Sequence, residues 1–179
     1  MTTLTAAPAP CAGPVVSRPI RRAAHAAALT LVPSGLWRVV IAVGVPVGWG
    51  AGSGLEADLF PGVWSFYLVA LSAFAEGLGL LTLGLVQRWG EVVPSWIPRL
   101  GGRRIPPLAA VVPAALGAAA VTLVTVSGAF VWSTNMTMPG APTGAGWWLM
   151  TACYAPLLLW GPLLAVVTAA YWRRRRVHG

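Results

Sequence analysis

Glu76 is the residue of this sequence best suited to chemistry, because it is a single acid near the middle of a long apolar run, 60–88. In a helix it would lie about eleven residues from one end of the span and about fourteen from the other, or roughly 17–21 Å at 1.5 Å per residue. That depth is too great for its short side chain to reach water. An ionised carboxylate there would cost several kcal/mol, so we expect a protonated acid that faces other helices. The sequence therefore predicts either a proton-sensitive or solute-contacting site at mid-membrane, or a neutral acid that hydrogen-bonds a neighbouring helix.

Candidate neighbours of Glu76 follow from spacing and from depth. Ser72 precedes it by four residues and Gly79 follows it by three, which places all three on one side of a helix. A proline at the same depth would leave the carbonyl four residues earlier without a donor, so that a neutral acid could bond to it. The candidate neighbours are Pro46, Ser72, Gly117, Thr122, Tyr154 and Pro162. No second acid, histidine or cation is expected at this depth, which favours the hydrogen-bonding role over proton chemistry.

Other residue types that support catalysis are sparse or badly spaced. The two histidines, His25 and His178, lie in the terminal segments, and the two cysteines, Cys11 and Cys153, are not expected to meet. The sequence has no glycine-rich phosphate loop, no GxSxG motif and no HExxH motif. We therefore expect no catalytic residue, no metal site, no cofactor and no enzyme activity.

The composition predicts that these residues are carried by membrane-spanning helices. The chain has 179 residues, of which 57% are hydrophobic and 9% are charged, whereas a soluble domain has about 25% charged residues. Four apolar stretches are long enough to cross a bilayer, at 34–51, 62–87, 107–132 and 147–172. The predicted fold is therefore an all-α integral membrane bundle of four transmembrane helices, with its transmembrane domain at 34–172.

The segments outside this domain are predicted to be cytoplasmic tails. Residues 1–33 are rich in proline and alanine and cannot bury a core, so we expect a disordered or interfacial tail. Within it, 20–31 is expected to lie on the membrane surface as a short basic helix. A cleaved signal peptide is the competing interpretation, but no convincing cleavage site follows the short apolar segment. Residues 173–179 form a basic tail.

The arginines predict which side of the membrane faces the cytoplasm. All twelve basic residues are arginines, and with these spans all of them lie on one side, including Arg38, whose long side chain would reach back to the headgroups. The positive-inside rule makes that side cytoplasmic and places both termini there. Those expected to contact anionic lipid headgroups and to fix the topology are Arg88, Arg99, Arg103, Arg104, Arg173, Arg174, Arg175 and Arg176. Nine of the ten tryptophans lie at span ends or in the interfacial loop, and Trp160 alone is mid-span.

One segment, 75–120, carries a distinctive core in which RWGE is followed by spaced prolines and then by LGGRR. It resembles a stretch of uncharacterised small four-helix integral membrane proteins of GC-rich bacteria. The resemblance covers about a quarter of the chain. It implies a membrane location and a four-helix form, and it carries no assigned activity.

For function, the sequence predicts a non-enzymatic accessory or partner-binding component of the cell membrane. Its expected partners are the lipid bilayer with its anionic headgroups, and either another membrane protein or a second copy of the chain. No nucleic-acid partner is expected, because the basic tail lacks interleaved aromatic residues. The alternative is a small transporter or proton-coupled permeation unit that uses Glu76. A third interpretation, a membrane enzyme subunit that handles a lipid or quinone, would require a cofactor.

Overall fold

The computed structural model describes residues 16–45, 47, 62–87, 90, 102, 105–138 and 141–177. Within these residues the chain forms helices and connecting turns, with no strands. The helices are α1 (Arg18–Leu29), α2 (Val32–Ala42), α4 (Val63–Gly84), α5 (Pro107–Phe130), α6 (Trp132–Asn135), α7 (Ala145–Tyr154) and α8 (Leu157–Val177). Four helical stretches are long and apolar enough to cross a membrane: Arg18–Ala42, Val63–Gly84, Pro107–Phe130 and Ala145–Arg176. The prediction of an all-helical fold with four such stretches is confirmed.

The first stretch lies earlier in the chain than predicted. The predicted span 34–51 overlaps the observed stretch only at 34–42, because α1 and α2 together form Arg18–Ala42; 46 and 48–51 lie outside the described residues. The predicted tail, 1–33, is therefore helical from its eighteenth residue onward. The segment before 34 was not assigned to a span because its apolar part is short and arginines flank it, although the whole stretch Arg18–Ala42 is long and apolar enough to cross a membrane. Its small side chains, however, allow close helix packing, and Ala24 and Ala27 are completely buried.

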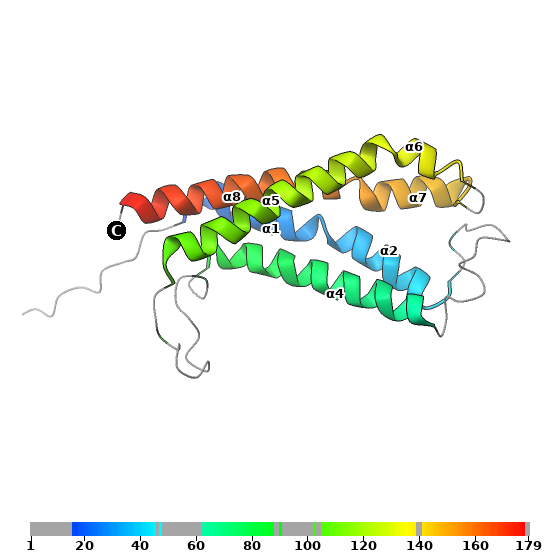
Figure 1. Ribbon diagram of the computed structural model, residues 1–179, viewed down its shortest axis with the longest axis horizontal. Coiled ribbons are helices and arrows are strands. Elements are labelled where there is room, and N and C mark those ends of the chain that lie inside the picture. The colour runs from blue at the N-terminus through cyan, green and yellow to red at the C-terminus, as the bar shows by residue number, and fades with distance from the viewer. Residues whose placement is uncertain are drawn as a thin grey trace, which may run out of the picture.

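The first stretch is interrupted between α1 and α2 (Figure 1), and Pro33 lies in the first turn of α2. Proline has no N–H, so the carbonyl one turn before it loses its helical donor. The hydroxyl of Thr30 donates to the carbonyl of Ala27 at 2.7 Å. The hydroxyl of Ser34 donates to the carbonyl of Leu31 at 2.9 Å. Both buried hydroxyls are thus satisfied locally, and the helix resumes at once after the interruption.

The four stretches run in alternating directions, so that the start of α1 lies beside the end of α8 (Figure 1). α4 packs along α1 and α2, α1 also packs on α8, and α5 packs along α8. The stretch made by α1 and α2 is the central layer: 44% of its most apolar 18-residue window is buried, against 6% for α5. The first stretch is therefore the element on which the bundle is built.

One apolar cluster joins all four stretches near the middle of the bundle. Its buried members are Ala27, Leu31 and Trp160, and among the residues packed against them are Ala75, Leu78 and Val121. The indole of Trp160 is 7% exposed. This burial explains why that tryptophan lies mid-span while the others were predicted at the interfaces.

Candidate functional site

Glu76 lies on the face of α4 that packs against α2. A methyl group added at Gly35 of α2 would lie 2.8 Å from Oε1 of Glu76. One turn further along α4, a methyl group added at Gly79 would lie 2.5 Å from Cδ1 of Leu31. The first stretch and α4 therefore interlock through two reciprocal contacts, in which each presents a glycine to a longer side chain of the other.

Glu76 and Ser72 line a groove of about 360 Å³ between α2 and α4, which we call the Glu76 groove. Oγ of Ser72 is buried and has no hydrogen-bond partner in the part of the chain that the structure describes. In that same part, no hydrogen bond or ion pair is found for the half-buried Glu76. The groove is open along its rim, where Leu36 and Val69 are 61% and 44% exposed. Two polar groups thus lie in an apolar groove without a described partner from their own chain.

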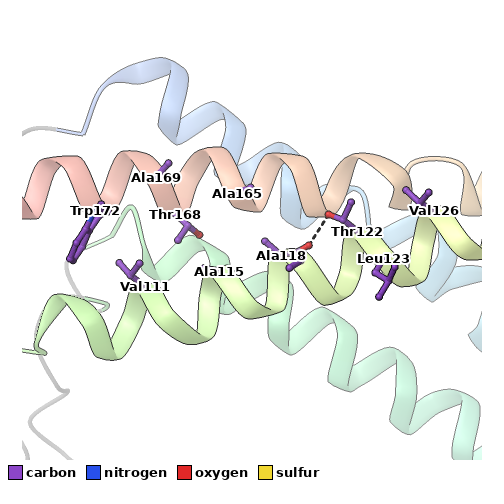
Figure 2. Close-up of a pocket in the computed structure, with 11 residues that line it drawn as sticks. Val111, Ala115, Ala118, Thr122, Leu123, Val126, Ala165, Thr168, Ala169 and Trp172 are labelled. Atoms are coloured by element: carbon purple, nitrogen blue, oxygen red, sulfur yellow. Dashed lines mark hydrogen bonds between the residues drawn. The ribbon is translucent and has the colours of Figure 1, made fainter.

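Among the described residues predicted to surround Glu76, Ser72 is the one that lines its groove. Thr122 lies between α5 and α8, where its hydroxyl donates to the carbonyl of Ala118 at 2.7 Å (Figure 2). Tyr154 is at the end of α7, in a different cavity of the bundle. The three hydroxyl side chains predicted as neighbours of Glu76 are therefore distributed over three separate sites.

The remaining predicted neighbours, and one contact that sequence reasoning missed, follow from how the helices pair. Pro162 is exposed on α8, and a methyl group added at Gly117 would have no neighbour within 4 Å. Pro46 lies outside the described residues. The contact of Gly35 with Glu76 was missed because the first span was predicted to begin at 34. That start would put Gly35 at the end of the span and not deep in the bundle. The sequence does contain one indication of this position. Gly35 follows Leu31 by four residues, so the two residues lie on the same helix face.

A second groove, of about 670 Å³, runs between α5 and α8 (Figure 2). Its lining is apolar apart from Thr122 and Thr168. Both hydroxyls donate to the carbonyl four residues earlier, at 2.7 and 2.8 Å. Because these polar groups are already satisfied, this groove offers apolar contact and little capacity for chemistry.

Two arginines of the C-terminal segment are bound within the protein. Nη2 of Arg174 donates to the carbonyl of Leu85 at 3.2 Å, just after α4. Nη2 of Arg175 donates to the carbonyl of Ile105 at 2.9 Å, just before α5. These bonds tie the end of α8 to the ends of two other stretches. The other arginines predicted to contact headgroups are Arg173 and Arg176, which are exposed, and Arg88, Arg99, Arg103 and Arg104, which lie outside the described residues.

Arg38 lies at the opposite end of the bundle, which corrects its predicted position. Because the first stretch begins at Arg18, Arg38 is one turn from the end of α2 and not one turn from the start of a span. Its guanidinium carbon is 5.5 Å from the centroid of the Tyr154 ring, at the end of the molecule that holds α6 and α7 (Figure 1). Arg38 thus lies away from the described arginines that begin α1 and end α8, whereas the side of the membrane on which each arginine lies stays a prediction.

Comparison of the chain with protein-family models, with curated protein sequences and with solved structures found no match. The resemblance of 75–120 to small bacterial membrane proteins stays a prediction. Most of its distinctive core, 88–104, lies outside the described residues.

Proposed function

We propose that this chain is a multi-pass membrane protein that binds a transmembrane helix of another membrane protein in the Glu76 groove. It acts as an accessory component of that partner and not as an enzyme. The main support is Glu76, a half-buried carboxyl group that lines this groove and lacks a described partner. A buried polar group without a hydrogen bond costs about 1–3 kcal/mol in proteins, and a donor from outside would recover that cost.

A membrane setting is supported by the surface of the bundle. Large apolar side chains are widely exposed on α4 and α5, for example Phe66 at 77%, Leu123 at 69% and Phe130 at 81%. Water would disfavour such a surface, whereas lipid chains would cover it. The arginines that begin α1 and end α8 lie together at one end. We therefore propose that this end, with both termini, is on the cytoplasmic side of the cell membrane.

The proposed occupant is a helix with a side-chain hydrogen-bond donor, because the groove presents acceptors on an otherwise apolar surface. In lipid, helices associate through close packing and through interhelical hydrogen bonds, since apolar surface alone gives no advantage over lipid. The groove offers both features. Small side chains at Gly35 and Ala73 allow a helix to approach, and the carboxyl group of Glu76 offers the polar contact.

Site-specific photo-crosslinking in native membranes tests this proposal. A benzophenone side chain at Leu36, on the rim of the Glu76 groove, should form an adduct with one membrane protein, and mass spectrometry should place it on a helix with a side-chain donor. The same probe at Leu116, an exposed position on α5, serves as the positional control. The Leu36 adduct should be lost in Glu76→Leu and retained in Glu91→Gln, which removes an acid elsewhere in the chain.

An adduct that survives Glu76→Leu would contradict the proposal, as would an adduct to a second copy of this chain or to lipid alone. The transporter alternative is supported by the same acid, since Glu76 can be reached from the open groove. It predicts solute or proton flux in liposomes that contain only this protein, with loss of flux in Glu76→Gln. An accessory protein should give no flux in that assay.

A further inference from the structure

We propose that Arg38 and the cavity around it form a binding site for an anionic amphiphile, with a carboxylate or phosphate head and an alkyl chain. The site lies at the end of the bundle opposite the termini and is independent of the Glu76 groove. The cavity has a volume of about 440 Å³ and is lined by residues of α2, α5, α6, α7 and α8. Binding sites for small molecules span roughly 300–1,000 Å³.

The first argument is the unmatched charge of Arg38. Its side chain is half-buried, and its guanidinium stands over the Tyr154 ring at 5.5 Å. In the part of the chain that the structure describes, no carboxylate or carbonyl accepts a hydrogen bond from it. A cation–π contact uses the face of the guanidinium and leaves its five N–H donors available. A half-buried arginine with free donors is well suited to bind a carboxylate or a phosphate.

The hydroxyl groups of the two threonines that line the cavity are already committed to hydrogen bonds. Thr151 accepts a hydrogen bond from Nε1 of Trp132 at 3.1 Å and donates to a backbone carbonyl at 2.8 Å. Thr125 donates to the carbonyl of Val121 at 2.8 Å. Among the described residues that line the cavity, Arg38 is the only charged one, and its positive charge sets the sign of the ligand.

The second argument is the apolar remainder of the cavity. Val124, Ala129 and Leu158 line it without polar side-chain atoms. Trp132 also lines it, and tryptophan is enriched where a span meets the headgroups. An anionic head at Arg38 would thus lie near the headgroup level, while an alkyl chain extended along the apolar walls. This arrangement fits both a phospholipid and a free fatty acid, which share an anionic head and an apolar chain.

Calorimetric titration of the full-length protein in neutral detergent tests the site. The probes are dodecanoate, dodecyl phosphate and dodecyltrimethylammonium, which share one chain and differ in head charge. We expect the two anions to bind and the cation not to bind. Arg38→Gln should weaken anion binding at least about tenfold, because a charge-assisted hydrogen bond is lost. The matched control is Arg22→Gln, which removes an exposed arginine at the other end and should leave the affinity unchanged.

The two anions distinguish the natural source: tighter dodecyl phosphate supports a phospholipid, and tighter dodecanoate supports a fatty acid. Arg38→Lys keeps the charge without the forked donors and should bind with intermediate affinity, so the site can be tested even if the glutamine variant folds poorly. Equal affinity in wild type and Arg38→Gln would overturn the proposal. A large gain in affinity in Glu56→Gln/Asp58→Asn would also overturn it, because it would show that an acid of the chain already neutralises Arg38.

Discussion

Oε1 of Glu76 lies 2.8 Å from the point where the side chain of Gly35 would begin. The contact exists because residue 35 has no side chain, and one turn along α4 the same relationship is reversed between Gly79 and Leu31. The polar site and the packing of the first stretch on α4 are therefore built from the same pair of helix faces. A change at either glycine should alter both.

The first prediction compares two glycines of α4. Gly79→Ala should destabilise the protein by about 1–3 kcal/mol, because the added methyl would lie 2.5 Å from Cδ1 of Leu31, which is 1% exposed and has little room to move. Gly77→Ala should be neutral or stabilising by up to about 1 kcal/mol, because its methyl would meet nothing within 4 Å and alanine favours the helix. Unfolding in mixed detergent micelles measures both. Equal losses in the two variants would contradict the interlocked arrangement.

The contrast between the predicted and observed spans shows what hydropathy can and cannot determine. The second, third and fourth spans were predicted close to Val63–Gly84, Pro107–Phe130 and Ala145–Arg176, because long apolar runs need no knowledge of partners. The first was not, because its helix begins with arginines and contains Pro33. Joined together, α1 and α2 are long and apolar enough to cross a membrane, and their buried alanines pack against the other helices.

The candidate site, like the spans, has some features that the sequence predicts and others that it does not. The sequence correctly placed Ser72, Glu76 and Gly79 on one face of a helix, since their spacing depends only on the helical period. It could not say which helix that face meets, and the candidate neighbours on α5, α7 and α8 were chosen by depth alone. An error in the start of the first span also moved Arg38 to the wrong end of the bundle. Helix pairing is a three-dimensional relationship that spacing along one chain does not determine.

The second prediction concerns the contact between α5 and α8. Gly161→Ala should cost about 1–3 kcal/mol, because the new methyl would collide with the side chain of Thr122 and lie 3.0 Å from its backbone nitrogen. Thr122→Ala should recover part of this loss when combined with it, since it removes the collision with the hydroxyl and leaves Cβ and the backbone nitrogen at 3.0 Å. A double-mutant cycle measures the coupling between the two sites. The control Gly128→Ala, with nothing within 4 Å, should change little, and strict additivity of the first two changes would refute the contact.

The third prediction separates two arginines of the C-terminal segment. Arg175→Gln should lower the free energy of unfolding by about 1–2 kcal/mol, because it removes the hydrogen bond to the carbonyl of Ile105 at 2.9 Å. Arg173→Gln removes the same charge from an exposed position and should change stability by less than about 0.5 kcal/mol. Because both variants lose one positive charge, any difference between them reports the bond and not the topology signal. Equal effects would leave the arginines with an electrostatic role alone.

The fourth prediction concerns the stability of the isolated protein. Since Glu76 has no described hydrogen-bond partner in its own chain, Glu76→Leu should leave the free energy of unfolding unchanged or raise it by up to about 1 kcal/mol. A bond to another helix of the same chain would instead give a loss of about 1–3 kcal/mol, and Glu76→Gln, which can still donate and accept, would show a smaller loss. Unfolding of the purified protein in detergent micelles distinguishes these outcomes. A loss in the leucine variant would mean that Glu76 holds its own bundle together, and the groove would then have no unmet acceptor to offer a partner.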